Sequence, residues 1–293
     1  MPQEKEAEPK RNASRRQVIV AGGAAVAVVG AGGALAVARD TSADASAIAA
    51  QNTGSESAEV CYRLSSQAME GPYYIDADKI RTDITEDREG IPLTLSIKVI
   101  DSVTCRPVRG AAVDIWHCDA LGLYSGYEDS SSPPPGGAPS ATPTATPTGD
   151  PGEHQEPTDD RRYLRGTLRT GHDGRVRFVT VFPGWYPSRA VHIHAKVHVD
   201  GVWTKGGYEG GRTCHTGQLY FEEEAVRASA EVEPYSANDT PRVTLAEDTI
   251  YDQTGTTGGL LTLKYHKRNI SKGVSASITV GVDPDAVDDG DDG

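Results

Sequence analysis

Apolar and polar residues alternate in several short runs of this 293-residue chain, and this alternation constrains the fold more than any other feature. Between residues 93 and 99 every second residue is Leu, Ile or Val, and similar runs occupy 176–182 and 191–199. Two later apolar runs lie at 261–265 and 277–282. A period of two places successive side chains on opposite faces of a half-buried strand. We therefore expect an all-β fold, a β-sandwich of mostly antiparallel strands with long loops.

Helical periodicity is scarce, with one short candidate at 222–230. The strand pattern between residues 61 and 282 indicates one sandwich domain. Within it, the stretch 130–160 is rich in Ser, Pro, Gly and Thr and has few apolar side chains. We expect it to be a disordered loop, and its Pro/Thr repeats are candidate sites for sugars. A linker between two domains is the alternative, but the first half has too few strands for its own core.

The first 38 residues have the three parts of an export signal. Arg15 and Arg16 precede an apolar run over 18–38, which ends in a small-x-small cleavage pattern. We expect residues 1–38 to direct export by the twin-arginine route, so that the mature protein is secreted. A transmembrane anchor is the alternative, since the run is about long enough to span a bilayer. A Ser-, Ala- and acid-rich flexible linker, 39–60, would follow the signal.

The chain is acidic, with a formal net charge of −13. Removal of residues 1–38 takes away five basic and three acidic residues, a net of +2, and leaves a charge of −15. Such a charge repels nucleic acid and anionic membranes, so we expect neither as a partner. The acidic tail 283–293 should be solvated. The sequence leaves the oligomeric state open.

Four cysteines in an exported chain favour disulfide bonds. Cys61 and Cys105 flank the first predicted strands, while Cys118 and Cys214 each lie beside a candidate site motif. The expected pairs are therefore Cys61–Cys105 and Cys118–Cys214, one of three possible pairings. A zinc site is the alternative, but no two of the four cysteines are spaced as C-x-x-C.

Two histidines in the third predicted strand are candidate metal ligands. His192 and His194 are two residues apart, so their side chains leave the strand on the same face and can converge on one ion. Val191 and Ile193 belong to the core face, which turns the histidines away from it. His198 lies on the histidine face roughly 13 Å farther along, too far to join the same ion. A His-x-His pair alone is more often structural than metal-binding.

Two tyrosines near these histidines change that balance. Tyr186 follows a Pro-Gly turn directly before the histidine strand, and Tyr124 ends an upstream strand and turn. Two phenolates and two imidazoles form a hard, doubly negative ligand set that suits Fe(III), and phenolate ligation of ferric iron has precedent. Zinc sites more often use thiolate, imidazole or carboxylate ligands. A half-buried tyrosine whose hydroxyl meets the backbone is the ordinary alternative for each residue.

Four segments resemble the intradiol ring-cleavage dioxygenases, a family that includes catechol 1,2-dioxygenases and protocatechuate 3,4-dioxygenases. The resemblance extends over residues 70–221, and its Tyr…Tyr-x-x-Arg-x-x-His-x-His signature is highly specific. It implies ferric iron held by Tyr124, Tyr186, His192 and His194 on a β-sandwich. The segments are 70–74 (EGPYY), 114–124 (DIWHCDALGLY), 183–194 (PGWYPSRAVHIH) and 215–221 (HTGQLYF).

The resemblance also implies a reaction. A catechol-type substrate and O₂ would give a cis,cis-muconate-type dicarboxylate, with the ring opened between its two hydroxyls. Tyr186 resembles the ligand that substrate displaces, and Arg189 and Gln218 resemble residues that face the substrate ring. Arg189 would stabilise charge that develops on the ring. Tyr127, three residues after Tyr124, is an alternative ligand. The export signal and the loop at 130–160 are typical of secreted bacterial members.

Two other classes of function compete with this hypothesis. A non-catalytic, secreted β-sandwich that binds a carbohydrate or a partner would need no convergence of tyrosines and histidines. A cupin-type oxygenase or zinc hydrolase would need a carboxylate ligand, and no Glu or Asp lies between Tyr186 and His194. Colour distinguishes them, because among these only ferric phenolate ligation should give a red to brown protein without haem.

Overall fold

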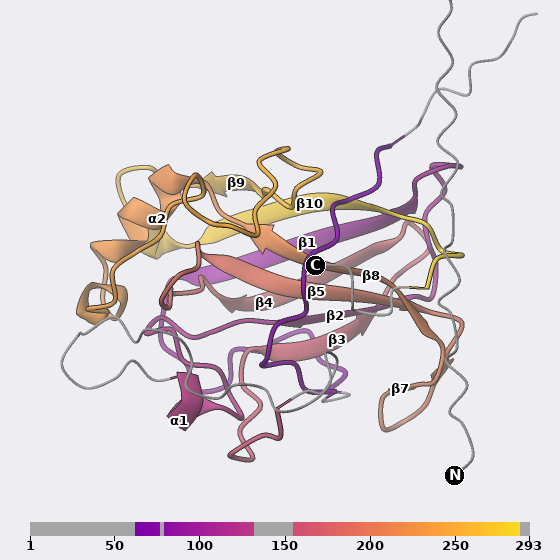
Figure 1. The fold of residues 1–293 in the computed structure, drawn as a ribbon, viewed down its shortest axis with the longest axis horizontal. Coiled ribbons are helices and arrows are strands. Elements are labelled where there is room, and N and C mark those ends of the chain that lie inside the picture. Colours follow the sequence, from indigo (N-terminus) through magenta and orange to yellow (C-terminus); the bar gives the residue numbers. More distant parts are fainter. Residues whose placement is uncertain (1–61, 77–78, 132–154, 288–293) are drawn as a thin grey trace, which may run out of the picture. The chain divides into compact units, whose positions relative to one another are not determined.

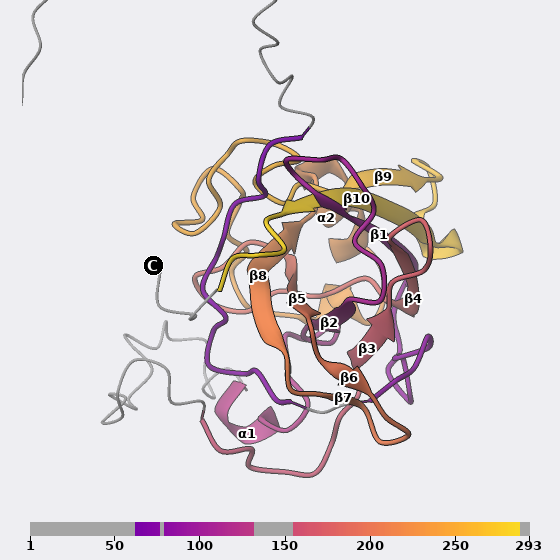
Figure 2. The same ribbon diagram turned by 90° about the vertical axis from the view of Figure 1, so that its right-hand side faces the viewer.

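The computed structural model describes residues 62–76, 79–131 and 155–287, which all belong to one compact unit, Ser55–Gly293. These residues form two four-stranded sheets and a two-stranded hairpin. The two larger sheets lie as two layers (Figure 2). The expected β-sandwich of mostly antiparallel strands with little helix is therefore confirmed.

The first sheet has the strand order β4-β1-β10-β9 (Figure 1). Strand β1 pairs antiparallel with β4 but parallel with β10, in register from Leu93 opposite Val274 to Asp101 opposite Val282. Parallel neighbours cannot be joined by a tight hairpin, which is why β10 comes from the far end of the domain. The strands are β1 (Pro92–Asp101), β4 (Arg175–Val181), β9 (Thr262–Tyr265) and β10 (Val274–Val282).

The second sheet has the order β3-β2-β5-β8, and all its pairs are antiparallel. A register shift between Val197 and His198 marks an irregularity in the β5–β8 pairing. The strands are β2 (Ala112–Trp116), β3 (Arg165–Arg169), β5 (His192–Val199) and β8 (Arg212–Tyr220); the small hairpin pairs β6 (Val202–Trp203) with β7 (Tyr208–Glu209).

The main core lies between the two sheets. In β1 the alternate residues Leu95 and Ile97 are fully buried, and Phe178 of β4 packs in the same cluster. The second sheet contributes Ile193 and Val197 from β5. Full burial of such a side chain stabilises the fold by about 1.5–3 kcal/mol. The apolar residues whose alternation predicted the strands are thus the side chains that pack the two sheets together.

One α-helix follows β8 where the helical pattern predicted it. This helix, α2 (Glu223–Ala230), buries Ala225 and Val226 in the main core and leaves its acidic first turn outside. A single turn, α1 (Glu128–Ser131), and two 3₁₀ turns, η1 (Tyr235–Ala237) and η2 (Ile270–Lys272), complete the helices of the described residues.

The expected loop 130–160 is too long at both of its ends. Ser131 is buried, and its hydroxyl accepts a hydrogen bond from Tyr124 N and donates one to Tyr127 O. At the other end the Asp159 carboxylate accepts a hydrogen bond from Gly126 N. These short polar residues satisfy backbone groups of the folded domain, so low hydrophobicity alone placed the ends of the loop wrongly. Residues 132–154 lie outside the described part of the chain.

The predicted export signal, the linker 39–60 and the end of the acidic tail also lie outside the described residues. Within the residues that the structure describes, no helix is long and apolar enough to cross a membrane.

Candidate active site

His192 and His194 begin β5 and project from the face of the second sheet that turns away from the main core. Ile193 between them packs into that core. Both imidazoles are buried, and their Nε2 atoms lie 3.1 Å apart. The strand period therefore brings the two predicted ligands together as expected.

Neighbouring strands fix the orientation of these imidazoles. In the register of the sheet, His194 lies between Trp116 of β2 and Gln218 of β8, while His192 lies opposite Tyr220. The Trp116 ring stacks on His194 with centroids 4.8 Å apart and an interplanar angle of 8°. The His192 Nδ1 atom lies 2.7 Å from the Ala190 carbonyl oxygen. A carbonyl only accepts, so Nδ1 carries the proton and Nε2 keeps its lone pair.

Tyr186 reaches the same point from the loop before β5. Its hydroxyl lies 3.1 Å from His192 Nε2, and its ring meets Tyr124 edge-on with centroids 5.6 Å apart. Gly122 makes this approach possible, since its φ is +89° and a Cβ there would lie 2.4 Å from the Trp185 carbonyl oxygen. The turn that carries Tyr124 therefore packs directly on the turn that carries Tyr186.

The structure distinguishes the two candidate tyrosines of the 124–127 turn. The Tyr127 hydroxyl donates to the backbone oxygens of Tyr74, at 3.1 Å, and Gln155, at 2.6 Å. The Tyr124 hydroxyl is buried and makes no hydrogen bond of normal length within the described residues. Tyr186 is nevertheless near enough for the two phenols to affect each other's pKa. Tyr124, not Tyr127, is thus the tyrosine whose oxygen joins the cluster.

These four side chains fit a metal ion. One lone pair on His192 Nε2 faces both the Tyr186 hydroxyl and His194 Nε2, and a cation at their meeting point would satisfy all three. It would also satisfy the orphaned Tyr124 oxygen. The described residues contain no group of three or more His, Cys, Asp or Glu side chains that could hold a metal. A metal at this cluster would therefore rely on phenolate ligands, which favours ferric iron.

Burial shifts the pKa values of the two histidines and of the two tyrosines in opposite directions. It lowers the pKa of His192 to about 3, with a further contribution from the Arg189 charge, and holds the pKa of His194 well below its usual range. Both imidazoles are therefore neutral ligands near pH 7. Burial raises the pKa of Tyr124 and of Tyr186, so both phenols stay protonated until a strong cation displaces the protons.

Arg189 and Gln218, the two other predicted site residues, are joined directly. Arg189 Nη2 donates to Gln218 Oε1, and the Tyr220 hydroxyl donates to the same oxygen at 2.9 Å. On its other side, Arg189 Nε donates to the Asp248 carboxylate at 3.0 Å. Tyr220 and Asp248 were not predicted as site residues. Tyr220 shares the strand face of Gln218 and was within reach of the period-two argument, whereas Asp248 lies in an irregular segment without a motif.

A segment from the start of the domain covers the cluster. Gly71, with a φ of +80°, lies against His194, where a Cβ would be 3.3 Å from Cε1. The Met69 carbonyl oxygen accepts a hydrogen bond from Gln218 Nε2 at 3.0 Å. Glu70 forms a largely buried ion pair with Lys196, two residues beyond His194. The motif at 70–74 is therefore the cover of the histidine cluster.

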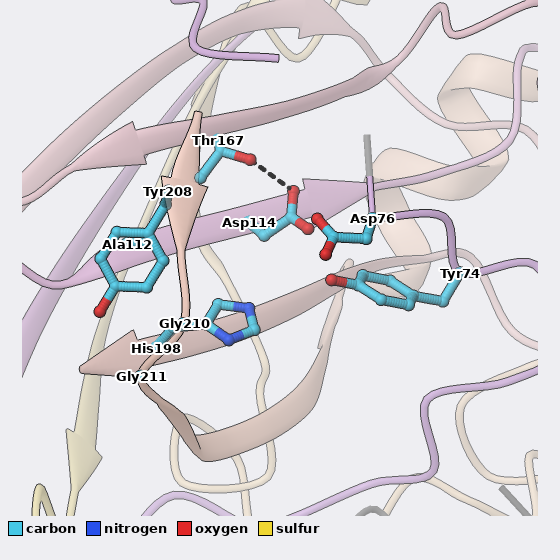
Figure 3. Close-up of a pocket in the computed structure, with 9 residues that line it drawn as sticks. All are labelled: Tyr74, Asp76, Ala112, Asp114, Thr167, His198, Tyr208, Gly210 and Gly211. Atoms are coloured by element: carbon cyan, nitrogen blue, oxygen red, sulfur yellow. Dashed lines mark hydrogen bonds between the residues drawn. The ribbon is translucent and has the colours of Figure 1, made fainter. Parts of the chain in front are cut away.

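A separate cavity of about 230 Å³ lies on the same sheet face, farther along β5 (Figure 3). Its polar lining includes Asp76, Asp114, Thr167 and His198, and Asp114 Oδ1 accepts a hydrogen bond from Thr167 Oγ1 at 3.1 Å. None of the four candidate metal ligands lines it. His198 is half-buried here, beyond reach of the cluster, as its strand position predicted. The cluster, not this cavity, has the convergent donors of a catalytic site.

The expected disulfide between Cys118 and Cys214 is wrong, because both are buried and neither is in a disulfide bond. The reason is the sandwich itself. Cys214 packs in the core between the sheets, whereas Cys118 packs in the aromatic cluster with Trp116 and Tyr124. Cys105 is in a disulfide bond, as expected, and Cys61 lies outside the described residues.

Comparisons with known proteins agree with the fold and with the motifs. A family model described as Dioxygenase matches residues 69–137. The structure of an intradiol ring-cleavage dioxygenase from Tetranychus urticae superposes with a TM-score of 0.62 and 31% sequence identity. That superposition covers 77% of this chain and 97% of the other.

Curated relatives match a smaller part. The chain is 27% identical over 181 residues to a chlorocatechol 1,2-dioxygenase from Cupriavidus pinatubonensis. That match covers 54% of this chain and 55% of the other protein. It is 27% identical over 125 residues to catechol 1,2-dioxygenase 1 from Acinetobacter lwoffii, 41% of this chain and 32% of that protein. The chain therefore spans about half the length, or less, of these relatives.

Proposed function

Because the chain belongs to the intradiol ring-cleavage dioxygenase family, we propose that it is a ferric enzyme that opens catechol-type rings between their two hydroxyls. One observation carries the proposal. The Tyr186 hydroxyl and the Nε2 atoms of His192 and His194 converge, with His192 Nε2 3.1 Å from each of the other two, and the Tyr124 hydroxyl is buried beside them without a partner among the described residues.

The proposed cofactor is one Fe(III) per chain, held by Tyr124, Tyr186, His192 and His194. When bound, ferric iron would accept electron density from the catechol oxygens and make the ring reactive toward O₂, which no side chain of this site can do. The two imidazoles are neutral and two phenolates would carry two negative charges, so the ligand set matches most of the charge of the ion. The two phenolate charges matter because a ligand set without negative charge would bind a ferric ion weakly.

Tyr186 is the ligand that we assign to proton transfer. It is half-buried and lies in a loop, with exposed Pro187 and Ser188 after it, whereas Tyr124 is completely buried. Movement of the Tyr186 side chain away from the cluster would therefore disturb less packing than movement of Tyr124. A free phenolate with a high pKa is a strong base, so the Tyr186 oxygen would accept a catechol proton as the substrate binds.

Arg189 is proposed to stabilise negative charge as it moves onto the substrate ring. Its guanidinium lies at the edge of the cluster, and Tyr220 connects it to His192. The Tyr220 hydroxyl lies 3.1 Å from Arg189 Nη2, and the Tyr220 ring centroid lies 5.8 Å from the His192 ring centroid. Gln218 fixes this arrangement, because its side chain bonds Arg189 and the cover at Met69 together. A donor fixed before the reaction stabilises charge without having to reorganise.

The proposed substrates are catechol and substituted catechols, with O₂ as the second substrate. Two of the relatives are named for chlorocatechol and catechol, which supports this class without selecting a member of it. The expected product from catechol is cis,cis-muconate. The experiment is oxygen uptake by the iron-loaded protein over a panel of catechols, with His194→Ala as the inactive control. No uptake with any catechol would refute the proposal.

We also propose that the protein is exported by the twin-arginine route. Support comes from the disulfide bond of Cys105, since disulfides persist in oxidising compartments outside the cytoplasm. The test is cell fractionation of the full chain and of a variant with both Arg15→Lys and Arg16→Lys. Export predicts that only the variant stays in the cytoplasm, and equal export of the two proteins would contradict it.

A further inference from the structure

Asp248 is a buried carboxylate with an unusually complete set of donors. Its side chain is 0% exposed. Oδ2 accepts hydrogen bonds from Arg189 Nε at 3.0 Å and from Ala190 N at 2.7 Å. Oδ1 accepts from Ile250 N at 2.8 Å and from Tyr251 N at 3.0 Å. The carboxylate is therefore immobile, and it joins the loop before β5 to a segment about sixty residues later in the chain.

The same carboxylate determines where the Arg189 guanidinium lies. Nε is bonded to Asp248, and Nη2 is bonded to Gln218 Oε1 and to the Tyr220 hydroxyl. Asp248 and two residues of β8 thus hold two of the three nitrogens. Within the described residues Nη1 makes no hydrogen bond, so one edge of the guanidinium is left for a ligand. A planar guanidinium held at two nitrogens keeps the direction of its third.

Charge neutralisation does not explain this arrangement by itself. An Arg189–Asp248 ion pair would weaken the field of Arg189, but the Asp248 charge is shared with three backbone N–H groups. Burial alone would raise the pKa of Asp248, yet the bonds from Ala190 N and Arg189 outweigh it and lower that pKa. A stable carboxylate anchor then orients the arginine without occupying its free edge.

From this geometry we infer that Asp248 is a positioning residue of the ring-opening reaction, which orients Arg189 so that its Nη1 edge meets the charge developing on the substrate. The inference rests on the proposed function. It assigns to Asp248 no contact with substrate or metal. Its effect should therefore appear in turnover and only through Arg189.

The first test compares Asp248→Asn with Glu247→Gln, the same change of carboxylate to amide one residue earlier. The amide that Asp248→Asn introduces would have to point its NH₂ group either at Arg189 Nε and Ala190 N or at the two backbone N–H groups that now bond Oδ1, and all of these are donors. We expect turnover to fall roughly 10- to 100-fold, as misplacement of a positioned group commonly does. Iron content, colour and anaerobic affinity for catechol should stay within about twofold of wild type. Glu247, whose carboxylate accepts hydrogen bonds from Thr244 N and Thr244 Oγ1, should tolerate its change.

The second test is a double-mutant cycle with Arg189→Ala. If Asp248 acts through Arg189, the double variant should turn over as slowly as Arg189→Ala alone, within about twofold. Losses that multiply would overturn the inference, and so would wild-type turnover in Asp248→Asn. Should Asp248→Asn not fold, Arg189→Lys replaces it, since lysine keeps the charge but cannot bond Asp248 and Gln218 together. Wild-type turnover in Arg189→Lys would overturn the inference.

The two proposals fail in different ways. A wild-type protein that holds iron but consumes no O₂ with any catechol overturns the proposed function and this inference with it. A wild-type protein that opens catechol, with Asp248→Asn equally fast, overturns the inference alone.

Discussion

His192 and His194 direct their Nε2 atoms at each other across 3.1 Å, in the part of the sheet where each ring is also fixed by a neighbour. A hydrogen bond between two neutral imidazoles uses the lone pair of only one of the two rings. A cation at the same point would gain from both lone pairs. The pair is therefore better explained as half of a metal site than as structural packing.

The first prediction concerns iron retention. His194→Ala should remove iron and the ferric-phenolate colour, whereas His198→Ala, on the same face of β5 but outside the cluster, should keep both. Loss of one ligand in four leaves the ion exposed to competing chelators. The measurement is iron content after dialysis against a chelator, together with the visible spectrum. Equal iron in the two variants would contradict the assignment of the ligands.

The second prediction separates Tyr124 from Tyr127. Tyr124→Phe should lose iron, yet the metal-free protein should be as stable as wild type or more so, because the variant removes a buried hydroxyl that makes no hydrogen bond of normal length among the described residues. Tyr127→Phe should keep iron but lose about 1 kcal/mol of unfolding free energy, because its hydroxyl bonds the backbone. Iron content and urea denaturation test both. The reverse pattern would make Tyr127 the ligand.

The third prediction concerns the contact between the two tyrosine turns. Gly122→Ala should destabilise the fold both by its left-handed φ and by the clash with the Trp185 carbonyl oxygen. Gly255→Ala is the matched control, because Gly255 has a φ of +70° with open space where a Cβ would be. The control should cost about 1–2 kcal/mol, and Gly122→Ala a further ~1–3 kcal/mol. Equal losses in chemical denaturation would disprove the close contact.

The fourth prediction concerns pH and the buried Asp114 of the cavity. Burial raises the pKa of Asp114 to about 7, against about 4 in an unfolded chain. Between these values the folded state binds a proton that the unfolded state has released. The Asp114 contribution to unfolding free energy should therefore fall as pH rises from about 4 to about 7, by at most ~1.4 kcal/mol per unit, and level off above.

Asp114→Asn removes this titration. Relative to wild type, the variant should gain stability between pH 5 and pH 8 in urea denaturation. Difference curves for Asp114→Asn that are flat across this range would mean that Asp114 titrates alike in both states.

Local patterns predicted most of the fold, because each depends on neighbours in the chain. The alternation at 93–99 predicted β1, and the same period placed His192 and His194 on one face. Relationships between distant segments were not accessible in this way. Asp248 meets Arg189 across 59 positions, and nothing in the composition of its loop marks it. The cysteine pairing failed for a related reason, since the face on which Cys118 and Cys214 pack depends on strand order.

The most direct test of the central claim is the product that iron-loaded protein forms from catechol under ¹⁸O₂. Cleavage between the hydroxyls predicts cis,cis-muconate, a dicarboxylate without an aldehyde, that carries both labelled atoms, less any label exchanged with water. Mass spectrometry identifies the product and its label together. A yellow semialdehyde, which marks cleavage beside the diol, or the absence of any product from an iron-loaded sample would contradict the account.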